Sequence, residues 1–303
     1  MSAPVPDVVG LGLVTVDDLY VIDEIPTFGE SGRARERSQQ CGGPVPTALA
    51  ALSRLGVQTR FLGRLGDDAD GDFILDELRR FGVDVSLVER EPGARSRRAV
   101  VLVESGSGER GFLTLAETCA PLGADELSSS LFSDARVLHL DDADEVEIAA
   151  ARMAKGLGLT VTWDGTWQHA DLDLLLPLVD YAIVSEYFAR RWMPWAADEA
   201  ILRALVERGA GHSVLTLGER GSLALSAGEY VRVPTHAVKA RDTTGAGDAY
   251  HGSFIYGLLQ EWPLDRVMRF ASAVGALNCR QLGGQRGLPT LHQVEKFLNR
   301  LSS

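Results

Sequence analysis

The order of apolar segments along this chain constrains its fold more than any other feature. Short apolar runs with the length of buried strands alternate with longer runs of helical periodicity through most of the 303 residues. The strand-like runs are 8–14, 59–64, 136–140, 159–163, 181–184 and 213–217, and the helix-like runs are 48–55, 70–81, 145–157, 199–208, 248–259, 264–279 and 292–301. Such alternation predicts an α/β fold, in which helices cover both faces of a mostly parallel sheet. Ligands of these sheets bind beyond the carboxyl ends of the strands.

Two stretches depart from this alternation. Residues 19–40 hold short β-prone pieces, and residues 95–103 and 110–115 predict two more strands. We expect these pieces to form a small sheet beside the main body. Because the chain has 45% hydrophobic residues and no low-complexity linker, we expect one domain over residues 1–303.

Composition excludes several classes of function. The net charge of −12 argues against a general nucleic-acid binder, which needs a basic face. No apolar run reaches the length of about 18 residues that spans a bilayer, so we expect no membrane association. The three cysteines are widely spaced and odd in number, which favours a reducing cytoplasmic location over a disulfide framework.

The run Asp242-Thr243-Thr244-Gly245-Ala246-Gly247-Asp248 carries the clearest chemical signal. A loop of small residues leads directly into an apolar helix, and an aspartate stands at the junction. Glycine lets backbone N–H groups converge, and a helix start leaves N–H groups unpaired and partly positive. Together they predict a phosphate site, and Asp248 then stands where a general base for a hydroxyl would be needed.

This run resembles the C-terminal signature of the ribokinase-like (PfkB-type) carbohydrate kinases, Asp-Thr-x-Gly-Ala-Gly-Asp, with Gly252 four positions on. The resemblance implies a three-layer α/β/α sandwich with a mostly parallel central sheet and a small β-sheet lid, here about 18–40 and 95–116. It implies transfer of a phosphoryl group from Mg-ATP to a sugar hydroxyl. Asp248 would be the base, and Gly245, Ala246 and Gly247 would form an anion hole. In this family the lid often pairs two subunits, so we expect a homodimer, with Leu19, Tyr20 and Ile22 as apolar candidates for the interface.

A second run, Cys41-Gly42-Gly43-Pro44-Val45-Pro46, resembles the N-terminal signature of the same family. Gly42 and Gly43 permit close backbone approach by a ligand. Pro46 stands where the family usually has an asparagine that hydrogen-bonds the sugar, and proline cannot do so. A similar loss occurs in the sulfofructose kinase branch, which the chain also resembles at residues 269–272 and Cys279.

The remaining site residues are expectations of the same kind. Asp17, Gly42 and Gly43 would bind the acceptor, and Arg33 on the small sheet is a candidate contact for an acidic or phosphorylated one. The residues expected at ATP are Thr216, Gly218, Gly221, Thr244, Gly247 and Asn278. The family's Asn-x-x-Glu is reduced to Ser185-Glu186-Tyr187-Phe188, where Glu186 is a candidate for magnesium placement. Asp242 and Thr244 are candidates for a monovalent cation such as K⁺.

Three alternatives stay open on sequence grounds. A nucleoside kinase of the same fold differs only in its acceptor pocket. A sulfosugar or sugar-phosphate kinase is favoured if an arginine such as Arg33 points into that pocket. A catalytically silent sugar or nucleotide sensor is disfavoured by the intact Asp248 and Gly245–Gly247 run, although the missing asparagine and the reduced motif at Ser185 keep it open.

Overall fold

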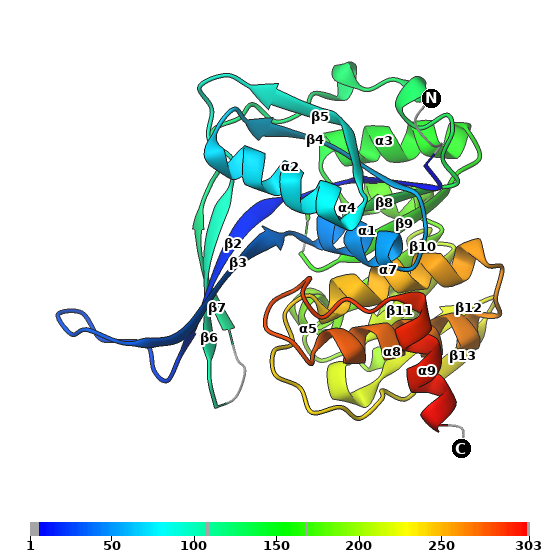
Figure 1. Cartoon of the computed structure of the whole chain (residues 1–303). Coiled ribbons are helices and arrows are strands. Elements are labelled where there is room, and N and C mark those ends of the chain that lie inside the picture. The colour runs from blue at the N-terminus through cyan, green and yellow to red at the C-terminus, as the bar shows by residue number, and fades with distance from the viewer. Residues whose placement is uncertain (1–5, 107–109, 168, 302–303) are drawn as a thin grey trace.

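The computed structural model describes residues 6–106, 110–167 and 169–301, and it contains two separate sheets. Residues 107–109 of the predicted turn between the lid strands, and the ends of the predicted 1–303 domain, lie outside the described residues. Figure 1 shows a layered main body from which the second sheet projects to one side. Of the described helices, none combines the length and the apolar character needed to cross a bilayer.

The larger sheet has nine strands and is parallel except at one edge. In spatial order these are β13 (Glu229–Val233), β12 (Ser222–Ser226), β11 (His212–Thr216), β10 (Tyr181–Ser185), β9 (Thr160–Gly165), β8 (Val137–Leu140), β1 (Val8–Leu11), β4 (Thr59–Gly66) and β5 (Asp84–Glu91). The predicted parallel direction is confirmed for the central strands. Three edge strands, β5, β12 and β13, were not predicted. β5 lacks alternation because it is half-buried along its length, and β12 and β13 form a short antiparallel hairpin.

Helices cover both faces of this sheet, as predicted. One face carries α3 (Glu145–Gly156), α4 (Leu172–Leu175), α5 (Glu186–Trp192) and α6 (Asp198–Glu207). The other carries α1 (Pro44–Arg54), α2 (Ala69–Phe81), α7 (Ala246–Leu259), α8 (Leu264–Asn278) and α9 (Leu291–Leu301). Successive residues of β1 enter the two cores in turn: Val8 packs with the second group of helices and Val9 with the first. The three-layer α/β/α prediction is therefore confirmed.

Close packing between α1 and its neighbours depends on two glycines. A Cβ at Gly10 of β1 would stand 2.5 Å from the Val45 side chain, and a Cβ at Gly252 of α7 would stand 2.3 Å from the Ala48 carbonyl oxygen. Helix α1 is therefore held directly between the sheet and α7. Its start at Pro44 is earlier than the predicted residue 48, because proline fits the first turn of a helix.

The second sheet has four strands, in the order β3 (Ala34–Gly42), β2 (Thr15–Ile22), β6 (Arg98–Glu104) and β7 (Arg110–Leu115). These are the pieces that the sequence separated from the alternating series. Leu19, Ala99, Val101 and Val103 form its small core. Two short connections join this sheet to the main body: β2 follows β1 after three residues, and β3 leads directly into α1.

Candidate active site

The segment before α7 is fixed by one buried carboxylate. One oxygen of Asp242 accepts hydrogen bonds from the Thr244 N–H (2.9 Å) and hydroxyl (2.7 Å), and the other accepts from the Gly283 N–H (2.7 Å). Gly245 has φ +71°, and a Cβ there would stand 2.5 Å from the Gly284 backbone. The loop therefore needs glycine at this position both for its conformation and for its neighbour.

This loop leaves the start of α7 open to a ligand. Gly245 is the N-cap residue and supplies no side-chain cap, so the N–H groups of the first turn have no side-chain acceptor at the cap. A Cβ at Gly247 would meet no atom within 4 Å, which leaves space above that turn. The predicted residues Gly245, Ala246 and Gly247 thus lie together at an uncapped helix start, a geometry that suits an anion.

Asp248 stands in the same first turn, beside other carboxyl groups. Burial raises its pKa well above the ordinary value, and the charges of Asp164, Asp141 and Asp17 raise the pKa further. Only Arg110 opposes them by lowering the Asp248 pKa. A carboxyl group in such surroundings gives up its proton reluctantly and is a stronger base once ionised.

These neighbouring acids come from adjacent strand ends. Asp164 lies on β9, Asp141 follows β8, and Asp17 lies on β2 just beyond β1. Burial, together with nearby charge, raises the pKa of Asp17 to about 7 and that of Asp141 to about 8. Asp141 accepts the Leu13 N–H with both oxygens, at 3.1 and 3.2 Å. Asp141 and Asp164 were missed on sequence, because an aspartate after a short strand carries no local signal.

A buried histidine lies beside Asp164. His251, one turn after Asp248 on α7, places Nε2 3.3 Å from one Asp164 oxygen, and the Thr166 hydroxyl donates to the other at 2.7 Å. Burial lowers the pKa of His251 to about 3, so the ring adds no positive charge beside Asp164 at neutral pH. The pair was not predicted, because scattered histidines gave no spacing to interpret.

Arg110 is a further residue that sequence reasoning missed. It begins β7, and its Nη1 donates to the Thr243 hydroxyl at 2.8 Å, across 133 residues of sequence. A cation from the small sheet therefore reaches the loop that precedes the helix start. A single arginine at the beginning of an exposed strand has no local feature that would single it out.

The predicted acceptor residues divide into two groups. Asp17, Gly42 and Gly43 lie together: a Cβ at Gly42 would stand 2.0 Å from an Asp17 carboxylate oxygen, and Gly43 has φ +105°. Pro46 is buried in the first turn of α1, where it offers no donor. Arg33 does not join this group. It is exposed, immediately before β3 at the outer end of the β2–β3 hairpin, which Figure 1 shows pointing away from the body.

The residues predicted for the nucleotide lie at the end of β11 and around the α8 terminus. Thr216 ends β11, and Gly218 and Gly221, with φ +55° and +85°, form the turn after it. Asn278 ends α8 and donates to the Gly284 carbonyl oxygen at 2.7 Å, while its own side-chain oxygen is buried without a partner. The Asn278 side chain and the Asp242 carboxylate therefore both contact the Gly283–Gly284 segment.

Glu186, the candidate for magnesium placement, is already paired with cations. One of its oxygens accepts from Arg220 at 2.6 Å and from Arg190 at 3.4 Å. A metal ion would have to compete with both guanidinium groups. Over the described part of the chain, no three His, Cys, Asp or Glu side chains form a group able to hold a metal ion.

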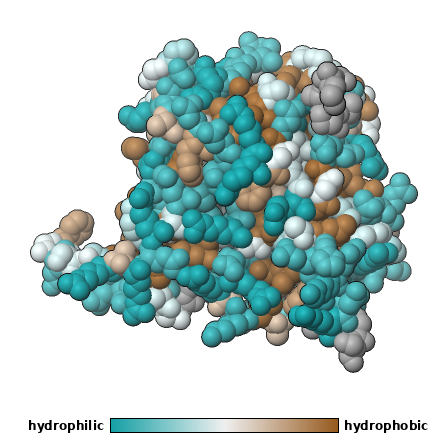
Figure 2. All heavy atoms as spheres, in the orientation of Figure 1, coloured by the Kyte–Doolittle hydropathy of each residue, from teal (hydrophilic) through white to brown (hydrophobic). Residues whose placement is uncertain are grey.

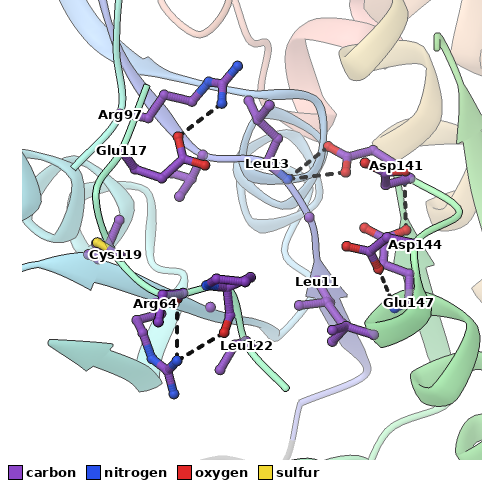
Figure 3. Close-up of a pocket in the computed structure, with 18 of the residues that line it drawn as sticks. Leu11, Leu13, Arg64, Arg97, Glu117, Cys119, Leu122, Asp141, Asp144 and Glu147 are labelled. Carbon is purple, nitrogen blue, oxygen red and sulfur yellow. Dashed lines mark hydrogen bonds and ion pairs between the residues drawn. The ribbon is translucent and has the colours of Figure 1, made fainter. Parts of the chain in front are cut away.

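A cavity of about 440 Å³ adjoins the acid cluster (Figure 3). Its walls are the 11–14 segment after β1, residues 63–65 of β4, the 117–122 segment after β7, and the start of α3. Asp141 lines this cavity, and its charge also raises the pKa of Asp248, so Asp141 belongs to both the cavity wall and the acid cluster.

Comparison with known proteins supplies the family. A family model described as pfkB family carbohydrate kinase matches residues 6–291. A deoxyribokinase of Salmonella typhi is 25% identical over 307 residues, which cover 97% of this chain and 99% of that protein. A putative ribokinase from Agrobacterium tumefaciens superposes with TM-score 0.89 at 24% identity, covering 97% and 98% of the two chains. The Arabidopsis thaliana ribokinase complexed with ribose and ATP superposes with TM-score 0.86 at 25% identity, covering 97% and 99%.

The carboxyl cluster predicts an unusual pH dependence of stability. Asp17 and Asp141 hold protons more tightly in the folded state than in the unfolded chain, so the free energy of unfolding falls as the pH rises through their raised pKa values. His139 and His251, whose pKa values burial lowers to about 3, oppose this trend only below about pH 6.5. We therefore expect chemical denaturation to show a loss on the order of 1 kcal/mol between pH 6.5 and 8.

Two variants locate the origin of that slope. Asp141→Asn should flatten it, whereas Asp76→Asn, on the exposed side of α2, should leave it unchanged. Stability that rises over this pH interval in the unaltered protein would contradict the assignment.

Proposed function

Because the chain belongs to the pfkB family of carbohydrate kinases, we propose that it uses the α7 start and Asp248 to transfer the γ-phosphoryl group of ATP to a sugar hydroxyl. The single observation that carries the residue assignment is the uncapped N-terminus of α7 with a desolvated carboxylate in its first turn. The confirmed family membership supports the activity, and the site geometry supports the roles of individual residues.

In the proposed mechanism, ionised Asp248 accepts the proton of the attacking hydroxyl. The N–H groups of Gly245, Ala246 and Gly247 stabilise the negative charge on the phosphoryl oxygens, and the rigid Asp242 clamp holds them in place before reaction. Asp17 accepts hydrogen bonds from acceptor hydroxyls. Phosphoryl transfer needs positioning and electrostatics more than covalent chemistry, so this set of groups is sufficient.

Arg110 supplies a positive charge to the same loop. Its bond to the Thr243 hydroxyl and its effect on Asp248 place the guanidinium beside both the anion hole and the base. We assign it to stabilising the transferring phosphoryl group and to bringing the small sheet over the cleft as a lid. A lid excludes water, which is a competing acceptor.

Magnesium is proposed as a cofactor held mainly by the ATP phosphates, where it neutralises developing charge. The paired state of Glu186 leaves little capacity for direct ligation, so its contribution would be indirect. Asp242 and Thr244 are proposed to hold a monovalent cation such as K⁺, since the Thr244 hydroxyl is bonded to the buried Asp242 carboxylate and the nearby Asn278 side-chain oxygen is buried without a partner. The three cysteines Cys41, Cys119 and Cys279 are free, which suits the proposed cytoplasmic location.

Replacing Asp248 tests the central assignment. Asp248→Asn should lower kcat by at least about 10²-fold, because an amide cannot accept the hydroxyl proton. Binding of a fluorescent ATP analogue should be nearly unchanged, which separates loss of the base from loss of folding. Asp76→Asn is the matched control, and a variant at Asp248 with near-normal turnover would remove it from the role.

Replacing Arg110 tests the cation. Arg110→Ala should lower kcat by about 10²-fold, the loss typical of one removed transition-state donor. The acidic limb of the pH–rate profile should also move to higher pH, because Arg110 holds down the Asp248 pKa. Arg35→Ala, on the same sheet and paired with Asp23 on the surface, is the control. An unshifted profile with normal kcat would contradict the proposal.

We also propose that residues 1–303 act as one kinase domain and that two copies associate through the lid. Of the three candidates from the sequence, Leu19 and Ile22 are buried within the monomer and Tyr20 is half-buried. Instead, the edge strand β7 exposes Phe112, Leu113 and Leu115, with exposed fractions of 54%, 65% and 52%. Ile25 and Phe28, between β2 and β3, are also exposed. Figure 2 shows apolar surface at the tip of the projecting hairpin. An exposed apolar edge strand is suited to pairing with another sheet.

Light scattering tests the association. The expected mass is twice the 32.7 kDa chain, and Leu113→Glu should shift it toward the monomer by placing a charge in the interface. Leu157→Glu, an exposed leucine after α3, is the control substitution. A monomer mass for the unaltered chain at micromolar concentration would end the proposal.

A further inference from the structure

The cavity beside Asp141 carries information about the acceptor that the family assignment does not. It shares Asp141 with the acid cluster around Asp248 and is not lined by Asp248 itself, so under the proposed kinase function it holds the part of the acceptor remote from the reacting hydroxyl. Its volume of about 440 Å³ is in the range of small-ligand sites. Figure 3 shows the polar side chains that line it coming from opposite walls.

Both arginines of the cavity wall are already neutralised. Arg97 donates to Glu117 at 2.9 Å, as Figure 3 shows. Arg64 pairs with Glu89 at 2.7 Å and with Glu126 at 2.5 Å, and it also donates to the carbonyl oxygens of Ala120 and Pro121. Arg64 therefore clamps the 117–122 segment and has little capacity to bind a ligand.

The carboxyl groups of the same wall have no such compensation. Asp141, Asp142, Asp144 and Glu147 line it, and in the described chain none of them pairs with an arginine or lysine. Asp142 contacts only His169 as a basic group, at 2.8 Å. Glu147 is buried, accepts the Asp142 N–H at 2.7 Å, and has its pKa raised well above the ordinary value by burial and by Asp141. The wall is therefore acidic or neutral, and it offers no free cation.

We propose that the acceptor carries no anionic group: the pocket takes an uncharged sugar or one bearing an ammonium substituent, and it discriminates against sugar phosphates, sugar sulfonates and sugar acids. An anionic group in this cavity would lie beside carboxyl groups that no cation compensates, and it would lose its hydration without gaining a cation. Hydroxyl groups, by contrast, can donate to ionised carboxylates and accept from protonated ones. An ammonium group would in addition relieve the repulsion among Asp141, Asp142 and Glu147.

The position of Arg33 agrees with this inference. An acidic acceptor was the reason to consider that side chain, and it lies outside the cavity wall at the far end of the β2–β3 hairpin. Nothing on the described wall replaces it, because Arg64 and Arg97 are held by their own carboxylates.

The test uses sugars matched in all but charge. Phosphorylation of glucose, glucosamine, glucose 6-phosphate and gluconate is compared, with parallel sets built on ribose and fructose. The kcat/KM for the best uncharged or amino member should exceed that for its phosphate or acid counterpart by at least about 100-fold, because juxtaposed like charges cost several kcal/mol. A phosphate, sulfonate or acid that reacts best would overturn the inference while leaving the kinase assignment intact.

Binding separates the two proposals. Calorimetry and thermal shift with the same sugars on the full chain, without nucleotide, need no catalysis. Uncharged or amino sugars that bind but are not phosphorylated would support the inference and count against the proposed function. Tighter binding of the anionic members, or no binding by any uncharged or amino member at millimolar concentration, would overturn the inference.

A single substitution in the wall provides an independent check. Glu117→Gln removes the carboxylate that neutralises Arg97, so activity on sugar phosphates should rise relative to the uncharged sugar by about tenfold or more. Glu77→Gln frees Arg80 on the surface of α2 in the same way, away from the cavity, and should change nothing. Equal selectivity in the two variants would show that charge in this wall does not decide the acceptor.

Discussion

The geometry of the proposed active site depends first on the hydrogen bonds that the buried Asp242 carboxylate accepts. A buried carboxylate is tolerated only when its oxygens accept hydrogen bonds, and here both do, one from Thr244 and the other from Gly283. These bonds join the loop before α7 to the segment after α8. The close approach of Gly245 to Gly284 is part of the same contact. The direction in which the first-turn N–H groups of α7 point is therefore set by residues about 40 positions away.

The fold then gathers negative charge in front of those N–H groups. Parallel strands end at one edge, so Asp141 after β8 and Asp164 on β9 meet Asp248 there without any local sequence relationship. Mutual repulsion and burial of these carboxyl groups lower the stability of the folded protein. Proteins retain such strain mainly at functional sites. The Thr166 hydroxyl limits the cost for Asp164 by donating a hydrogen bond to it at 2.7 Å.

Whether a feature could be predicted from the sequence depends on how far apart along the chain its interacting residues lie. The mostly parallel sheet and the helix predicted over 248–259 depend on periodicity and on a glycine-rich loop, which are local features; the fold was confirmed, and the helix starts at Ala246. Arg110 contacts Thr243 across 133 residues, and Asp141 contacts Leu13 across 128, so neither pairing leaves a pattern in one segment. Arg33 illustrates the opposite case: its charge was visible in the sequence, but its distance from the cleft depends on the length of a hairpin.

The two halves of the cleft consequently differ in how far a family signature can describe them. The phosphoryl half consists of backbone N–H groups and one aspartate within a single loop, so a short motif defines it. The proposed acceptor half consists of side chains from β2, the ends of β1, β4 and β8, and the segment after β7, so no short motif defines it. Pro46, for example, removes a donor from α1 while leaving the helix intact. Under the proposed function, the charge balance of the whole wall, rather than any one of its residues, is then the property expected to select the acceptor.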